Sequence, residues 1–172
     1  ANHIGTLNEK PLHAALKDYY AQPGDRFEVP VEQFHIDLVR GDLLVEFQTA
    51  GFGAIRRKLE ALLPNHPVRL VHPIAEAKWI VKLDRTGTDV LPRRKSPKEG
   101  CVDDLFEELV ALPKLLANEN FSLEGLMIHE EEARRDDRRR RKSWRRHERR
   151  LLEVVDRWVF ESPEDLTDLL PN

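Results

Sequence analysis

The sequence has too little cysteine and too few long apolar runs for several large classes of protein. A single cysteine, Cys101, excludes an internal disulfide framework and a zinc site built from cysteines. No apolar run approaches the roughly 18 residues that a transmembrane helix needs, and the first residues lack the charged-then-apolar pattern of a secretion signal. We therefore expect a soluble, intracellular protein with no membrane partner.

Motifs of several common enzyme classes are also missing. The glycine patterns of phosphate loops, dinucleotide-binding turns and nucleophile elbows are absent. The histidines never adopt a zinc-ligand spacing such as HExxH, so we interpret each as structural; they are His3, His13, His35, His66, His72, His129 and His147.

Positive charge is concentrated in one segment. The net charge is −3 over 172 residues, yet residues 134–150 hold eleven Arg or Lys against three Asp or Glu, a local charge of +8. Arginine beside an aromatic residue is a pairing that contacts phosphates and stacks on bases. We predict nucleic-acid contacts here, carried by Arg138, Arg139, Arg140, Arg141, Lys142, Trp144, Arg145 and Arg146. The alternative is an ion-paired surface, since the acids at 130–132 and 136–137 lie beside it.

Apolar spacing predicts an α/β fold in the first half of the chain. Leu12, Leu16 and Tyr20 recur at helical spacing, and a second helical pattern covers about residues 52–63. Strand-like runs lie between these helices, and two more follow around Pro73. We expect a core over residues 1–84 in the order helix, three strands, helix, two strands, with strands at 27–33, 35–39, 43–48, 68–74 and 78–84.

The second half is expected to be a small appendage. Residues 85–100 contain two prolines and two glycines without periodicity, which predicts a linker or an exposed loop. Residues 101–172 are expected to be mainly helical, with one strand at 122–129 and a helix over about 151–159. A short capped helix at 162–170 ends a segment that faintly resembles the start of a winged helix.

A tight turn fixes the register of one predicted hairpin. Gly41-Asp42 suits a type II′ turn, because glycine adopts the positive φ of the first turn position without steric cost. This register places Asp37 opposite Glu46, with Gln48 on the same face. Opposed like charges destabilise a sheet by some fraction of about 1 kcal/mol, so the pair calls for a cation or a raised pKa. The alternative is a solvated hairpin face that carries acids.

The oxygen-rich ligand set indicates a hard cation. Carboxylates with few histidines suit Mg²⁺ or Mn²⁺ rather than zinc. Glu9 adds a third acid, because it lies three positions before Leu12 and seven before Leu16, on the apolar side of the first helix. We expect it to point inward. The alternative is a capping box in which Thr6 and Glu9 hold the start of the helix.

The predicted elements run in the order helix, hairpin and strand with the motif D-x(8)-E-x-Q, and a helix with basic residues follows. This arrangement resembles the PD-(D/E)XK nuclease superfamily over about residues 5–84. The resemblance implies a restriction-endonuclease-like core, a mixed sheet flanked by helices, and Mg²⁺- or Mn²⁺-dependent hydrolysis of phosphodiester bonds in DNA. It assigns metal binding to Asp37, Glu46, the Phe47 backbone carbonyl and Glu9, and alignment of the attacking water to Gln48. Nucleases of this fold are often homodimers, and the resemblance leaves that state open.

One position departs from the pattern of the family. Gln48 stands where lysine is usual, and glutamine lacks the positive charge that stabilises the transition state. Lys58 or Arg56, which flank the buried stripe of the next helix, could supply that charge; the alternative is that both lie at the helix edge in solvent. The rival function is a non-catalytic nucleic-acid-binding or assembly module with a decayed nuclease core.

Overall fold

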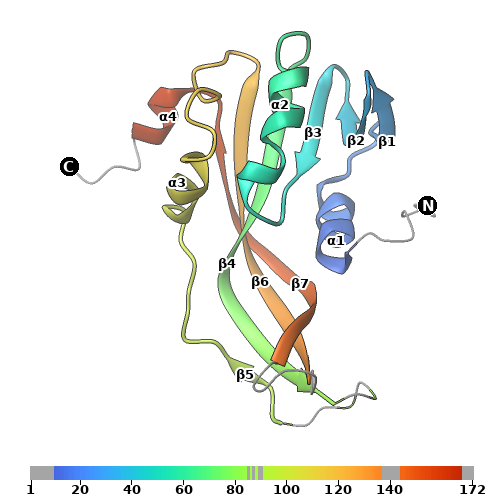
Figure 1. Ribbon diagram of the computed structural model, residues 1–172, viewed down its shortest axis with the longest axis vertical. Helices are drawn as coiled ribbons and strands as arrows, with labels where there is room; N and C mark the ends of the chain where they lie inside the picture. The colour runs from blue at the N-terminus through green and yellow to red at the C-terminus, as the bar shows by residue number, and fades with distance from the viewer. Residues whose placement is uncertain (1–9, 85, 87, 89–90, 137–143, 168–172) are drawn as a thin grey trace.

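One mixed β-sheet organises the molecule, as the computed structural model shows for residues 10–84, 86, 88, 91–136 and 144–167 (Figure 1). The described strands follow the order β1-β2-β3-β4-β6-β7, and β5 pairs with β4. The strands are β1 (Arg26–Val31), β2 (Phe34–Arg40), β3 (Leu43–Phe47), β4 (Val68–Leu83), β5 (Arg94–Lys95), β6 (Phe121–Asp136) and β7 (Trp144–Phe160). The helices are α1 (Pro11–Tyr20), α2 (Arg56–Leu62), α3 (Asp104–Leu109), α4 (Pro163–Thr167) and the 3-10 helix η1 (Phe52–Ala54).

The strand directions make the sheet mixed. β1, β2 and β3 form an antiparallel meander, β3 and β6 both run parallel to β4, and β7 returns antiparallel to β6. The first helix, the meander, the second helix and the parallel strand follow the predicted order, and the α/β class is confirmed.

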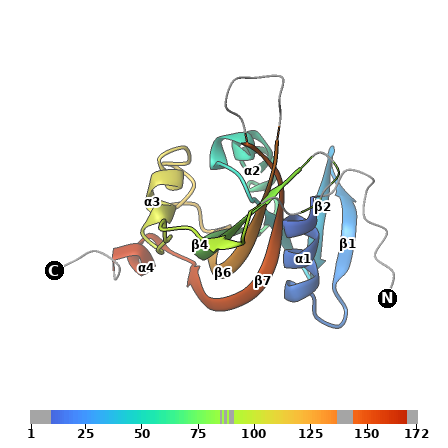
Figure 2. The same ribbon diagram turned by 90° about the horizontal axis from the view of Figure 1, so that it is seen from below.

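Two apolar cores lie on opposite faces of the sheet. The larger packs α2, η1 and α3 against one face through Leu59, Phe52 and Leu105. The second packs α1 against the other face through Leu12 and Leu16, which are both buried. Figure 2 shows α1 between β7 and the β1 end of the curved sheet. Each buried leucine contributes roughly 1.5–3 kcal/mol relative to exposure, so the predicted helical stripes hold both faces in place.

The predicted hairpin register is confirmed where β2 and β3 pair. Gly41 has a φ of +58°, as the turn requires. Leu38 pairs with Val45 and the next two pairs continue to the turn, Val39 with Leu44 and Arg40 with Leu43. The turn therefore fixes which strand positions meet at the far end of the hairpin.

β4 corrects the expected break at Pro73. The sequence predicts two strands, but β4 runs unbroken from Val68 to Leu83. Its pairing with β3 ends at Val71, whose carbonyl accepts the N–H of Gln48. Strand residues alternate between the two edges, so Pro73 directs its nitrogen to the same edge as Val71, where no β3 residue remains. Proline is tolerated because that position needs no donor.

The mainly helical second half is the prediction that fails. Residues 121–136 and 144–160 form β6 and β7, which continue the same sheet, and the expected helix over 151–159 lies within β7. The strand predicted at 122–129 is confirmed within β6, and the capped short helix corresponds to α4. The segment 85–100, predicted as a linker, contains β5 paired to β4.

The long strands extend beyond the helices. Figure 1 shows the far halves of β4, β6 and β7 leaving the helical body together, with β5 beside them. We call this part the arm and define it as residues 75–83, 94–95, 128–136 and 144–154. Within the part of the chain that is described, none of the helices is both long enough and apolar enough to pass through a membrane.

Candidate active site

β2 and β3 move apart beyond the Leu38–Val45 pair, and two carboxylates fill the gap. The Asp37 N–H donates to Glu46 Oε1 at 3.1 Å, and the Phe47 N–H donates to Asp37 Oδ2 at 2.9 Å. Side-chain oxygens thus replace the carbonyls that a regular antiparallel ladder would supply. The structure therefore brings together Asp37 and Glu46, here called the acidic pair, as the hairpin register predicts.

Lys58 of α2 places its ammonium group beside the acidic pair. Its Nζ donates to Glu46 Oε2 at 2.7 Å and to the His35 carbonyl at 2.6 Å. The ammonium also lies 6.0 Å from the centre of the Phe34 ring. Of the two basic side chains predicted to flank the buried stripe of α2, Lys58 reaches the acids, whereas Arg56 pairs with Glu60 at 2.8 Å on the helix surface.

His13 is a neighbour of the site that the sequence analysis missed. Its Nε2 lies 3.1 Å from Asp37 Oδ2, and its ring meets the Phe47 ring edge-on at 6.1 Å. The sequence analysis assigned every histidine a structural role because none has zinc spacing. The available signal was the spacing of three residues from Leu16, since residues one helical turn apart share a face.

Burial and nearby charges shift the pKa values of the two carboxyl groups in opposite directions. Burial, with the charge of Asp37, raises the pKa of Glu46 to about 7, although the Lys58 ammonium opposes the rise. Burial also acts to raise the pKa of Asp37, but His13, the Phe47 N–H and Lys58 outweigh it and leave that pKa below its usual value. The site therefore shows both responses that opposed carboxylates require, a nearby cation and a raised pKa.

Gln48 lies at the end of β3 with its side chain turned into the following loop. Its amide Nε2 donates to the Gly51 carbonyl at 3.0 Å. Its own carbonyl accepts from His72 Nδ1 at 2.6 Å, which makes Nδ1 the protonated ring nitrogen. Burial lowers the pKa of His72, which favours the neutral ring. Gln48 is thus next to the acidic pair in sequence, but its amide is already bonded to the loop.

Several predicted site residues fall outside the described part of the chain. Glu9 precedes it, and Arg138, Arg139, Arg140, Arg141 and Lys142 lie in the undescribed segment 137–143. Trp144, Arg145 and Arg146 belong to β7 by their backbone, and their side chains are outside the description.

The comparison with known proteins assigns a family. Residues 10–161 match the model described as "Domain of unknown function (DUF8091)". The chain belongs to this family. It is similar to an uncharacterized protein of Treponema pallidum (strain Nichols), with 37% identity over 171 residues that cover 97% of this chain and 68% of that protein. No solved structure matches the chain.

The DUF8091 match includes the acidic pair, whose side chains offer oxygen donors of the kind that hard divalent cations prefer. Among the described residues, no group of three or more His, Cys, Asp or Glu side chains gathers into a metal site. Magnesium, however, commonly uses one or two carboxylates and takes its other ligands from water and phosphate. The Phe47 N–H faces Asp37, so the Phe47 carbonyl is directed to the same edge of β3. Two carboxylates and one carbonyl therefore open onto the same gap.

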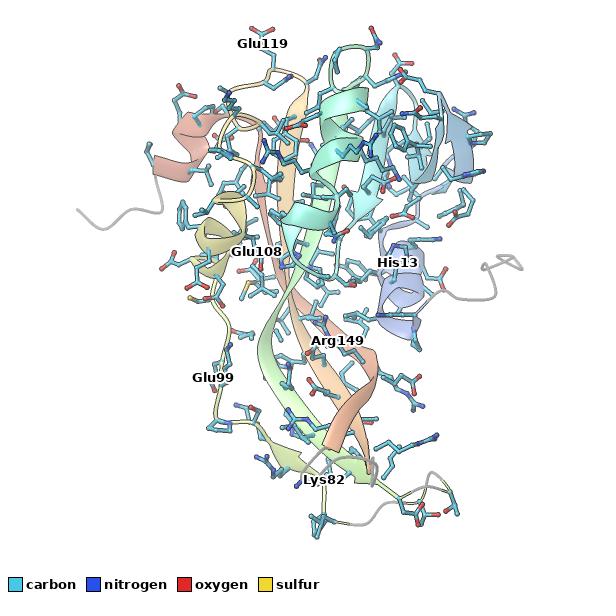
Figure 3. The ribbon with its side chains drawn as sticks, in the orientation of Figure 1. His13, Lys82, Glu99, Glu108, Glu119 and Arg149 are labelled. Atoms are coloured by element: carbon cyan, nitrogen blue, oxygen red, sulfur yellow. The ribbon has the colours of Figure 1, made fainter. Side chains whose placement is uncertain are left out.

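The arm is tied to the loop that follows β3. Arg149 of β7 donates Nη1 to the Thr49 carbonyl at 3.1 Å, while Nε and Nη2 both bond to Glu130 Oε2 at 3.0 and 2.7 Å. Glu130 is fully buried, and Lys78 contacts its other oxygen at 3.1 Å. Figure 3 shows Arg149 on the arm and His13 on α1. One arginine thus connects the arm with the end of the strand that carries Glu46.

Proposed function

We propose that the chain is a metal-dependent nuclease of the PD-(D/E)XK type that hydrolyses phosphodiester bonds in DNA. The observation that carries the proposal is the acidic pair, with Lys58 beside it, in the gap between β2 and β3. The element order from α1 to β4 also agrees with the restriction-endonuclease-like core that the sequence motif implies. These features support a catalytic site better than a solvated hairpin face, because Glu46 is only 4% exposed.

In this proposal Asp37, Glu46 and the Phe47 carbonyl would hold Mg²⁺ or Mn²⁺, with Glu9 available as a further acid. The cation, when bound, would offset charge on the scissile phosphate and increase the acidity of water. Asp37 has one oxygen engaged by His13 and the Phe47 N–H, which fixes the orientation of the carboxylate. A carboxylate held in one orientation loses less entropy when it binds a cation.

Lys58 takes the role that lysine has in the usual motif. Its ammonium already lies 2.7 Å from Glu46, so a phosphate beside the acidic pair would meet a positive charge close by. Positive charge placed where negative charge develops lowers the barrier to hydrolysis. Gln48, bonded to Gly51, would then hold the loop rather than align water. Arg56, which pairs with Glu60 on the surface of α2, would contact the substrate backbone.

The rival function, a binding module with a decayed core, rests on a specific observation as well. Lys58 already neutralises Glu46, so a pair without catalytic activity could persist as a buried ion pair. Under that function the chain would bind nucleic acid through its basic segments and cleave nothing. Both functions predict binding, and cleavage separates them.

Cleavage of a panel of duplex, flap, junction and single-stranded DNA with manganese tests the proposal. Wild type should cut at least one substrate, and Asp37→Asn should reduce that rate by 10²-fold or more, as expected on loss of a metal ligand. Asp42→Asn is the matched control, since Asp42 is exposed in the hairpin turn five residues away, and it should cut like wild type. If wild type binds every substrate and cuts none, the binding-module function replaces the nuclease.

A further inference from the structure

A short basic strap lies along the outer edge of the arm. Residues 93–98, with the sequence RRKSPK, hold four Arg or Lys in six positions, and five of the six residues are exposed. We call this segment the strap. The acid that follows it, Glu99, pairs with Lys95 at 3.1 Å, and Arg93 pairs with Glu131, so Arg94 and Lys98 carry the excess charge of the strap. Figure 3 labels Glu99 at this edge and Lys82 toward the end of the arm.

Specific contacts hold the strap against β4. Arg94 pairs with Ile80 in an antiparallel ladder, and the Ser96 N–H donates to the Lys78 carbonyl at 2.7 Å. Gly100 anchors the far end, because its N–H donates to the Ala75 carbonyl and an added Cβ would lie 2.7 Å from that same oxygen. The strap is therefore an ordered ridge of positive charge on the sheet.

One strap arginine rests on an aromatic ring. The Arg93 guanidinium lies 5.1 Å from the centre of the Trp79 ring and bonds to Glu131 at 2.7 Å. Lys95 is directly opposite Trp79 in the ladder, so it shares that face. Arg94 points to the other face, because side chains alternate along a strand. The strap thus presents cations on both faces of the arm.

The acids on the Arg94 face are already neutralised. Glu130 and Glu132 are buried, at 0% and 2% exposure, and Lys78 lies 3.1 and 3.0 Å from them. Arg149 binds the first acid and Arg134 binds the second. Two buried carboxylates therefore face three cationic side chains, so the exposed charge contributed by the strap is not cancelled on this face.

A cavity of about 460 Å³ leads from the strap toward the end of β3. Its lining includes Lys78, Ser96, Lys98 and Arg134, and it reaches His72, which bonds the Gln48 carbonyl. The lining also includes three acids, Asp104, Glu107 and Glu108. Asp104 accepts the Cys101 N–H and Glu108 accepts the Phe52 N–H. An anionic chain in this cavity would therefore contact Lys98, the strap cation of its lining.

We propose that the strap is a phosphate-contacting surface that holds a nucleic-acid backbone on the β5 edge of the arm and directs it along the cavity to the end of β3. The proposal deepens the proposed nuclease function by naming a part of its substrate-binding surface. A nucleic acid is the partner because cations alternate with a tryptophan–arginine stack, a combination that binds phosphates beside bases. A membrane-surface element would instead need a continuous apolar face, and the strap residues are polar or charged except for Pro97.

Salt dependence of duplex binding tests the proposal without any catalytic step. A short fluorescent DNA duplex is titrated with the 172-residue protein in EDTA at several salt concentrations. Arg94→Gln with Lys98→Gln should lower the slope of log affinity against log salt by about 0.9 for each lost phosphate contact. The matched control, Arg26→Gln with Lys114→Gln, removes the same charges from exposed positions on the body and should keep the wild-type slope. Equal slopes for the two double variants would overturn the strap proposal.

Lysine acetylation of the wild type gives a second measurement that needs no variant. Duplex DNA should protect Lys95 and Lys98 from reagent, while Lys114 should react as in the free protein. Unchanged reactivity of the strap lysines, absence of duplex binding by wild type, or binding to phosphatidylserine vesicles in place of DNA would each overturn the proposal. Strap-dependent binding without cleavage would leave the strap assignment intact and remove only the nuclease function.

Discussion

At the residue scale, the acidic pair shows how a fold tolerates two opposed carboxylates. Each acid accepts a backbone N–H from the other strand, so both hold positions that a regular ladder would give to carbonyls. Lys58 bonds to Glu46, whose raised pKa also reduces its negative charge near neutral pH, and His13 bonds to Asp37. Such tuned, buried groups cluster at functional sites because catalysis uses charge that water does not screen.

The pKa of Glu46 predicts a pH dependence of stability. Its value is about 7 in the fold against 4.5 for an ordinary glutamic acid. Between these values the folded protein binds a proton that the unfolded chain releases, so the Glu46 contribution to stability falls as pH rises from about 4.5 to about 7. The lowered pKa of Asp37 changes stability only at pH values below about its ordinary pKa of 3.8, so it does not affect this range.

Glu46→Gln should remove this dependence. Thermal unfolding of both proteins without metal, at about pH 5 and about pH 8, should show wild type gaining stability over the variant at the lower pH. The comparison uses the difference between the two proteins, which cancels the titration of groups that they share. The same difference in melting temperature between the two proteins at both pH values would mean that Glu46 does not titrate in this range.

The approach of Asp37 to Glu46 could be predicted from sequence, whereas the contact with His13 could not. The Gly41-Asp42 turn is a local signal with one preferred geometry, and it fixes strand positions close to it. The contact between His13 and Asp37 joins residues 24 positions apart. Such a contact depends on how α1 docks on the sheet, and a helical stripe defines the buried side of a helix without giving its partner.

At the element scale, the bulges of β7 explain why its apolar spacing predicts a helix. Its pairing with β6 skips Leu152 and Val155, which are bulge residues. A bulge inserts one residue and shifts the alternation of faces, so Leu151 and Val154, three apart, both pack toward α1. Apolar residues three apart on one face are the signature of a helix. The predicted helix over 151–159 is therefore wrong, because bulges in a strand produce the same spacing.

Among the contacts between elements, we expect the loss of those made by Arg149 to reduce stability most. Arg149→Ala would leave the fully buried Glu130 with one of its two cationic partners, and breaking a buried pair costs about 3–5 kcal/mol. Arg150→Ala is the matched control, because the Arg150 side chain is 62% exposed and pairs with Glu148; its expected cost is about 0–1 kcal/mol. Urea unfolding measures the stability lost in each of the two variants. Similar losses for the two variants would contradict the role given to Arg149.

At the scale of the whole molecule, β4 joins the site to the arm. Its first residues pair with β3, which carries Glu46, and its last residues pair with β5 and the arm part of β6. The local charge of +8 in residues 134–150 leaves −11 for the rest of the chain. This asymmetry could be read from the sequence. The pairing of β4 with β6, about 50 positions apart, could not, since non-local pairing leaves no local periodic signal.

The central claim is that Asp37 and Glu46 share one divalent cation, and a manganese titration tests it most directly. Calorimetry is best done near pH 8, above the Glu46 pKa of about 7, where both acids are charged. We predict one manganese site per chain in wild type, retained in Asp42→Asn and absent in Asp37→Asn. Equal manganese binding by wild type and Asp37→Asn, or no binding by wild type, would contradict the claim.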